Sequence, residues 1–218
     1  MPTEPAKLPL IQPLGDRGLL VRFADTLSES ANADAIGFAR RAAAAGLPGV
    51  EEVVPNLVSV LLRYAPDGVE FDRLAGEVRL LLAARAEELA PGQEHVVGVT
   101  FDGDDLAEVA ALLGMEREGF VAAHCARPLR VLATGFAPGF VYLGFHDERL
   151  LVPRRAAVRR QVPAGTVLFA AGQTAITSTP IPTGWHVLGH TTFRNFEPAA
   201  CPPTRLAAGD LVRFEVAR

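Results

Sequence analysis

The stretch from Gly135 to Leu143 contains two glycines that flank a proline, Pro138, and aromatic residues lie on either side of this proline. Glycine lets a backbone approach a ligand closely, proline stiffens a loop, and aromatic rings can form the walls of a flat pocket. An ordinary turn with buried aromatic side chains would have the same composition and is the alternative. The candidate binding residues of this stretch are Phe136, Pro138, Gly139, Phe140 and Tyr142.

A second candidate region is Gly172-Gln173-Thr174, where an amide and a hydroxyl follow a glycine. Gln173 can both donate and accept hydrogen bonds, so it suits an amide or carboxylate ligand. The same side chains could instead cap a local turn. Trp185, the single tryptophan, follows Gly184 and could either form a pocket wall or pack in the core.

His124 is expected at the end of a helix, where the helix dipole stabilises an imidazolium and the side chain can face a ligand. A nucleophilic pair with Cys125 is not favoured, because adjacent helical residues diverge by ~100°. Cys125 and Cys201 lack the spacing of a zinc site or a disulfide framework, so we expect two buried free thiols. His186 and His190 would lie ~13 Å apart on a strand, and they predict no metal site.

Residues 149–196 contain several closely spaced arginines but no aspartate or glutamate. The segment therefore offers no pair of carboxylates for acid–base chemistry, and no catalytic residue is assigned. Its positive charge predicts a local basic field that favours a small anionic ligand. The arginines that form it are Arg149, Arg154, Arg155, Arg159 and Arg160.

The composition of the whole chain excludes several classes of protein. With 218 residues, 49% of them hydrophobic, it can bury a core, and its net charge of −4 argues against nucleic acid or an anionic membrane as partner. No apolar run suits a membrane helix, and residues 1–7 lack a signal pattern, so we expect a cytoplasmic protein. The single lysine, Lys7, leaves no lysine for an ATP-binding P-loop.

The first half of the chain alternates short strands with helices. Gly18 to Phe23 has the alternation of a strand, and Thr26-Leu27-Ser28-Glu29 is a capping box that opens a helix ending near Gly46. Strands are predicted over 50–54 and 58–64, and a second helix runs from Phe71 to Leu89. This order predicts helices packed on an antiparallel sheet, with a domain boundary at Pro91-Gly92.

In the second half, short β-like runs are separated by glycine and proline. A strand over 95–101 precedes two helices, 104–113 and 116–125, and Asp104 and Asp105 lie near the positive end of the first helix. Many short strands with such punctuation predict a closed β-barrel. The later strands are predicted over 129–134, 166–171, 185–191 and 211–216.

With these motifs in view, the chain resembles the family of the 5-oxoprolinase B subunit, whose members are also called allophanate hydrolase subunit 1 or sporulation-kinase inhibitor. The resemblance rests on Gly135–Leu143 followed by Val162–Gly165, Gly172-Gln173-Thr174 and Gly184-Trp185. It implies an α+β protein with a ferredoxin-like α/β sandwich over residues 1–92. A cyclophilin-like β-barrel would follow over residues 93–218.

The resemblance also implies a function. The chain would be one component of a hydrolase that couples ATP hydrolysis to the opening of 5-oxoproline to glutamate, and it would be inactive alone. A homologue of the 5-oxoprolinase C subunit and an A subunit would be its partners, and ATP would be used by the complex. Gln173 and Thr174 would then bind the substrate amide, while Arg154 or a neighbour would hold its carboxylate.

Several residues depart from what is usual in the family, and they fall in the predicted pocket. Ala171 and Thr183 stand where glycine is usual, and His190 stands where arginine is usual. Val141 and Thr177-Ser178 replace segments that usually contain proline. The substrate could therefore be another small amide, related to allophanate or urea. A protein that inhibits a sensor histidine kinase is the third alternative, and it would need a surface but no pocket.

Overall fold

A computed structural model describes residues 9–84 and 92–217. The chain divides into two compact units, Met1–Ala90 and Pro91–Arg218. The predicted tail with Lys7 and Pro91 of the predicted boundary lie outside the described residues. The helix predicted from Phe71 to Leu89 ends earlier, at Ala83, because the backbone of Ala84 is extended. Within the described part of the chain, no helix is both long and apolar enough to cross a membrane.

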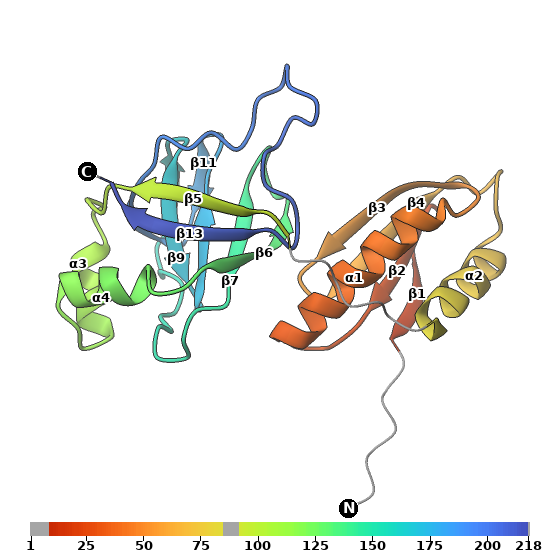
Figure 1. The fold of residues 1–218 in the computed structure, drawn as a ribbon, viewed down its shortest axis with the longest axis horizontal. Helices are drawn as coiled ribbons and strands as arrows, with labels where there is room; N and C mark the ends of the chain where they lie inside the picture. Colours follow the sequence, from red (N-terminus) through yellow and green to blue (C-terminus); the bar gives the residue numbers. More distant parts are fainter. Residues whose placement is uncertain (1–8, 85–91, 218) are drawn as a thin grey trace, which may run out of the picture. The chain divides into compact units, whose positions relative to one another are not determined.

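The first unit is a four-stranded antiparallel sheet, in the order β1-β2-β4-β3, with two helices (Figure 1). Leu19 and Val21 lie opposite Leu62 and Val60, and their side chains form the buried face on which both helices pack. The elements are β1 (Leu10–Leu14), β2 (Gly18–Arg22), α1 (Glu29–Ala45), β3 (Val50–Asn56), β4 (Ser59–Tyr64) and α2 (Phe71–Ala83).

Helix α1 begins one residue after its cap. The Ser28 hydroxyl accepts a hydrogen bond from the backbone N–H of Ala31 at 3.2 Å, and Gly46 ends the helix in the left-handed conformation with φ 56°. The predicted end at Gly46 is therefore confirmed. The capping residue is Ser28 and not Thr26, because the extended backbone of Ser28 lets its oxygen reach the first turn.

The second unit is built on a curled seven-stranded sheet in the order β12-β9-β10-β7-β6-β13-β5, and a two-stranded ribbon, β11-β8, stands beside it. In Figure 1, β5 and β13 cross in front of β9 and β7, which shows the curl, and α3 and α4 lie together near one end of it. The elements are β5 (Glu94–Val99), α3 (Leu106–Leu112), α4 (Arg117–His124), β6 (Leu129–Thr134), β7 (Val141–Gly144), β8 (Arg159–Val162), β9 (Thr166–Ala170), β10 (Gln173–Ile176), β11 (Ile181–Thr183), β12 (His186–His190) and β13 (Leu211–Val216).

The two edge strands of this sheet meet at a single bridge. The N–H of Thr100 donates to the carbonyl of His190 at 2.9 Å, and the N–H of His190 donates back at 3.0 Å. Gly103 and Asp105 add backbone hydrogen bonds to Leu188 and Val187. The prediction of a closed barrel is therefore correct only in part, because β5 and β12 do not pair along their length.

Candidate functional site

A small cavity lies where the β6–β7 loop, residues around Arg154, and the β11–β12 connection meet. Its volume is about 210 Å³. Its walls are mostly aromatic and aliphatic, and one charged side chain is present. The lining residues are Phe136, Phe140, Tyr142, Arg154, Ile181, Pro182, Thr183, Gly184 and Trp185.

The aromatic walls are in edge-to-face contact with one another. The ring centroids of Phe136 and Phe140 are 5.5 Å apart, those of Phe140 and Tyr142 4.9 Å, and those of Tyr142 and Trp185 6.0 Å. The guanidinium carbon of Arg154 lies 5.7 Å from the centre of the Trp185 ring, within the range of a cation–π contact. The structure thus brings five of the predicted site residues into one pocket.

The loop that carries Phe136 is held by the conformation of its glycines. Gly139 has φ 69°, and a Cβ atom there would come 2.4 Å from the Cβ of Phe196. Its carbonyl accepts hydrogen bonds from Ser178 Oγ and Asn195 Nδ2, each at 2.8 Å. Gly139 therefore supports the loop and does not line the cavity, and Pro138 is exposed beside it. Only glycine can occupy position 139 without moving the neighbouring chain.

Tyr142 and Arg154 are the titratable groups among the residues that line the cavity. Burial raises the pKa of the Tyr142 phenol, although the charge of Arg154 opposes this shift. The phenol is therefore neutral at physiological pH and can donate a hydrogen bond. Since the lining contains no carboxylate or imidazole, it offers cationic and hydrogen-bonding groups to a ligand but no general base.

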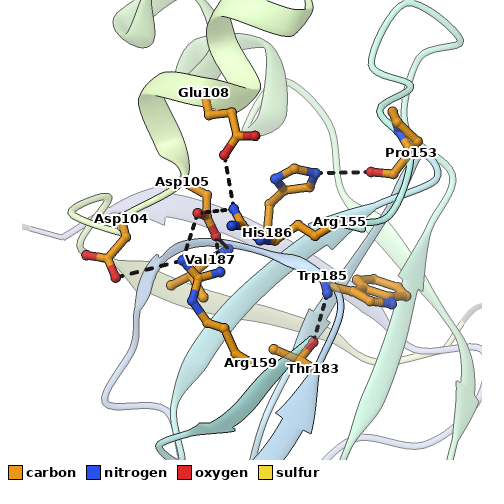
Figure 2. Close-up of polar contacts among 10 residues, drawn as sticks. All are labelled: Asp104, Asp105, Glu108, Pro153, Arg155, Arg159, Thr183, Trp185, His186 and Val187. Carbon is orange, nitrogen blue, oxygen red and sulfur yellow. Dashed lines mark hydrogen bonds and ion pairs between the residues drawn. The ribbon is translucent and has the colours of Figure 1, made fainter. Parts of the chain in front are cut away.

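Two arginines of the predicted basic field, Arg155 and Arg159, are neutralised by acids from another part of the chain. Figure 2 shows Arg155 and Arg159 converging on Asp105, which accepts from Arg155 Nη1 at 2.5 Å and from Arg159 Nη1 at 2.6 Å. Glu108 accepts a further bond from Arg155 at 3.0 Å. Arg149 is paired with Asp147. The prediction is wrong for Arg155 and Arg159, because Asp105 and Glu108 are about 50 positions away in sequence and local spacing could not reveal them.

Asp105 stands at the start of α3, as predicted, but its side chain makes no capping hydrogen bond to the helix. Burial raises the pKa of this carboxyl. Hydrogen bonds from Arg159 and from the backbone of Val187, together with the charges of Arg159 and Arg155, lower the pKa by more than burial raises it. The net effect is a pKa below the ordinary value. Asp105 is therefore an ionised, buried anchor for two arginines and a strand.

His124 and Thr174 lie outside the cavity, in a buried cluster. The Nε2 atoms of His124 and His146 each lie 2.8 Å from the Thr174 hydroxyl, and His124 and Thr174 are fully buried. Burial, with the charge of His146, lowers the pKa of His124 well below its usual value. The expectation of an imidazolium at the end of α4 is wrong, because removal from water outweighs the helix dipole.

The cysteines also differ from expectation. Cys201 is exposed, and Cys125 is half-buried with its sulfur 3.9 Å from His124 Nδ1. Burial, with the charge of Glu215, raises the pKa of the Cys125 thiol to about 11. Cys125 is thus a protonated thiol beside a neutral histidine, so it has neither the charge nor the partner of a nucleophile.

Comparison with known proteins decides the family. The family model for the carboxyltransferase domain, subdomains C and D, matches residues 9–206. Proteins named as the B subunit of 5-oxoprolinase are similar to this chain over most of its length: that of Bacillus subtilis (strain 168) is 32% identical over 94% of this chain and 91% of its own. That of Escherichia coli O157:H7 is 37% identical over 77% of this chain and 78% of its own. The chain belongs to the 5-oxoprolinase B subunit family.

Three solved structures are also similar to this chain. The crystal structure of TTHA0988 has a TM-score of 0.83 and 37% identity over 93% of this chain, and this chain spans 40% of it. The conserved uncharacterized protein PH0987 from Pyrococcus horikoshii has a TM-score of 0.56 and 31% identity over 95% of this chain and 97% of its own. Urea carboxylase from Kluyveromyces lactis shares only the fold, with a TM-score of 0.76 at 13% identity. This match covers 96% of this chain and 22% of the urea carboxylase chain.

The residues noted as unusual for the 5-oxoprolinase B subunit family have different surroundings. Thr183 lines the cavity, and its hydroxyl accepts a hydrogen bond from the Trp185 N–H at 3.0 Å. Ala171 has φ 51° at the tip of the β9–β10 hairpin. His190 is exposed and its Nδ1 lies 2.9 Å from Asp102 Oδ1. Of these three residues, only Thr183 could therefore alter ligand contacts in this cavity directly.

Asp105 and His186 were not predicted as parts of the site, because no local pattern marks either of them. His186 Nε2 lies 3.0 Å from the Pro153 carbonyl, next to the cavity arginine. Gln173, which was predicted to bind an amide, is half-buried at the start of β10 and does not line the cavity. The segment after Gly172 forms a strand, so its side chains alternate across a sheet instead of facing one ligand together.

Proposed function

We propose that this chain is the B subunit of an ATP-dependent 5-oxoprolinase, which opens 5-oxoproline to glutamate. The observation that carries the proposal is the small aromatic cavity with Arg154 over Trp185, in a chain 32–40% identical to three proteins that bear this name. On the same grounds we propose a ferredoxin-like first unit, a cyclophilin-like second unit, and a cytoplasmic location.

The cavity has the size and chemistry for such a ligand. Pockets for drug-sized molecules measure ~300–1,000 Å³, and about 210 Å³ suits a smaller molecule. 5-Oxoproline is a flat lactam ring with one carboxylate. The ring would lie against Phe140 and Tyr142, and the carboxylate would pair with the Arg154 guanidinium. Thr183 and the Tyr142 hydroxyl would offer hydrogen bonds to the lactam.

The chemical step would use groups from other chains. The cavity lining has no general base, and the single lysine, Lys7, is not among the described residues, so no P-loop lysine is available in them. The segment of TTHA0988 that matches this chain makes up 40% of the TTHA0988 polypeptide. This favours a role beside a second polypeptide, for which we propose a homologue of the C subunit, with an A subunit and ATP completing the complex.

The function is tested by reconstitution with co-expressed candidate A and C subunits. The complete mixture should release glutamate and ADP from 5-oxoproline and ATP, and omission of this chain should abolish glutamate release. Turnover that is unchanged without this chain would refute the assignment. The same mixture is also supplied with allophanate or urea in place of 5-oxoproline. Consumption of one of these compounds, without consumption of 5-oxoproline, would identify a related amide hydrolase.

Arg154→Gln tests the pocket itself. Loss of the charged partner should raise KM for 5-oxoproline by at least tenfold, since a hydrogen bond to a charged group contributes about 1.5–3 kcal/mol. Arg160→Gln is the matched control, because Arg160 is exposed on β8 and does not line the cavity. Equal KM values for the two variants would contradict the role of Arg154. Inhibition of a histidine kinase that survives Arg154→Gln would favour the kinase-inhibitor alternative.

A further inference from the structure

Arg154 lies between two residues whose backbones are fixed by β12 and the residues just before it. On one side, the Pro153 carbonyl is 3.0 Å from His186 Nε2. On the other side, the Arg155 N–H donates to the Gly184 carbonyl at 2.8 Å. Because Gly184 and Trp185 line the cavity, these two bonds tie the backbone around Arg154 to the wall that its guanidinium covers.

The Arg155 side chain adds a third tie, through Asp105. The Asp105 side chain is 4% exposed, and besides Arg155 it accepts bonds from Arg159 and from the Val187 N–H at 2.7 Å. One carboxylate therefore connects the residue after Arg154 to β8 and β12, as Figure 2 shows for these side chains. An ionised group this well buried is stable only with such partners.

His186 is arranged for its bond to Pro153 alone. A carbonyl can only accept, so His186 Nε2 must carry a proton and donate it to Pro153. The other ring nitrogen, Nδ1, is buried and has no hydrogen-bond partner among the described residues. An unpaired buried polar atom destabilises a fold. An apolar residue would avoid this cost, so the specific contribution of His186 is the hydrogen bond to Pro153.

We propose that His186 and Asp105 are positioning residues that hold the Arg154 guanidinium over the Trp185 ring. Arg154 itself forms no ion pair within residues 9–84 and 92–217, so its direction depends on the backbone that carries it. Its part in substrate binding rests on the function proposed above. The placement of the side chain does not, and it can be measured without substrate.

Trp185 is the single tryptophan, so its fluorescence in the full chain reports this contact directly. Acrylamide quenching should be low in the wild type, and Arg154→Gln should raise it by uncovering the ring. His186→Leu removes the donor to Pro153 and should raise quenching toward the Arg154→Gln value. His186→Gln, whose amide can still donate, should restore much of the wild-type value. His190→Leu is the matched control on the same strand and should leave quenching unchanged.

Asp105→Asn is the second variant. It keeps the proposal testable if His186→Leu fails to fold. It should also raise quenching at 25 °C while near-UV circular dichroism shows a folded chain. Wild-type quenching in either folded variant would overturn the positioning role of that residue. Wild-type quenching in Arg154→Gln would show that the guanidinium does not cover the ring, and this too overturns the proposal.

Binding of 5-oxoproline, followed by the same fluorescence, separates this inference from the proposed function. If the wild type binds it, His186→Leu should weaken binding by about tenfold, because misplacement of a binding group by a fraction of an ångström to 1 Å is costly. Unaltered affinity in His186→Leu with raised quenching would overturn the role in binding. Absence of wild-type binding would count against the proposed substrate, while the quenching results would still decide the positioning of Arg154.

Discussion

At the scale of single residues, the buried hydroxyl of Thr174 determines how two histidines can be protonated. Thr174 has one proton to donate, so it can donate to only one of His124 and His146, and the other ring must donate to it. Burial, with the charge of Arg127, lowers the pKa of His146 to about 4. Both rings are therefore neutral at pH 7.

This cluster predicts that acid destabilises the protein before its carboxylates are protonated. An unfolded histidine binds a proton near pH 6.5, so between pH 6.5 and about 4 the unfolded state holds more protons than the folded one. Stability is full above pH 6.5 and falls toward pH 4, by roughly 3 kcal/mol for His146. Urea unfolding at pH 7.5, 6.0 and 5.0 should show this loss.

His146→Gln is the informative variant, since it removes the titrating ring and keeps a hydrogen-bonding group near Thr174. Its stability should depend less on pH over the same range. His190→Gln, at the exposed end of β12, should retain the wild-type dependence. Equal pH dependence in the wild type and His146→Gln would contradict the role assigned to burial.

Cysteine reactivity gives a second prediction at this scale. The thiolate is the reactive form, and a pKa of about 11 leaves little of it on Cys125 at pH 8. Iodoacetamide at pH 8 should therefore modify the exposed Cys201 first, and the modification rate of Cys125 should rise steeply between pH 9 and about 11. Peptide mass spectrometry of the native protein distinguishes the two sites. Faster modification of Cys125 at pH 8 would be incompatible with its burial.

Residue types and local order were sufficient to predict the aromatic wall, because Phe136, Phe140 and Tyr142 lie close together in sequence. They were not sufficient for the charges. The arginines after position 149 looked unopposed, but Asp105 and Glu108 neutralise two of them from a distant segment. Partners that only the tertiary fold brings together have no local signal in one sequence.

At the scale of elements, the β9–β10 hairpin has an unusual turn. Gln173 pairs with Ala170, so its loop is Ala171-Gly172, and both loop residues have positive φ, 51° and 69°. Such two-residue turns strongly favour Asn-Gly or Gly-Gly. Because Ala171-Gly172 lacks this hairpin signature, Gly172-Gln173-Thr174 was predicted to be a ligand-binding turn, and strand β10 was not predicted. Strands β6 and β13, with regular apolar alternation between clear turns, were predicted with correct ends.

Ala171→Gly should therefore stabilise the protein. Removing the Cβ atom from a left-handed position relieves about 1 kcal/mol, although the added freedom of the unfolded chain offsets part of this gain. The midpoint of urea unfolding should rise. Ala170→Gly, one position earlier in the regular part of β9, should lower it instead. A lower midpoint for Ala171→Gly would show that the turn is not strained.

At the scale of the whole molecule, each unit has a core of its own. Phe38, Leu62 and Leu74 belong to the core of the first unit, while Phe214 and Leu143 belong to that of the second. Because Trp185 lies in the second unit, its fluorescence follows the unfolding of that unit alone. Far-UV circular dichroism follows both.

Phe38→Ala should separate the two transitions. Loss of a fully buried phenylalanine destabilises a core by about 3–5 kcal/mol, so the first unit should unfold at a lower urea concentration. The circular dichroism transition should broaden or split, and the Trp185 transition should keep its wild-type midpoint. A matching shift of the fluorescence midpoint would show that the units unfold as one.

The position of β13 has a consequence for how the second unit is made in the cell. β5, its first strand, has β13 as its neighbour in the sheet, in a parallel arrangement, and β13 in turn pairs with β6. A ribosome therefore releases β5 long before the strand that must lie beside it has been synthesised. The sheet can be completed only once β13 has emerged, and until then the strand edges that β13 will cover are unpaired and open to pairing with another chain.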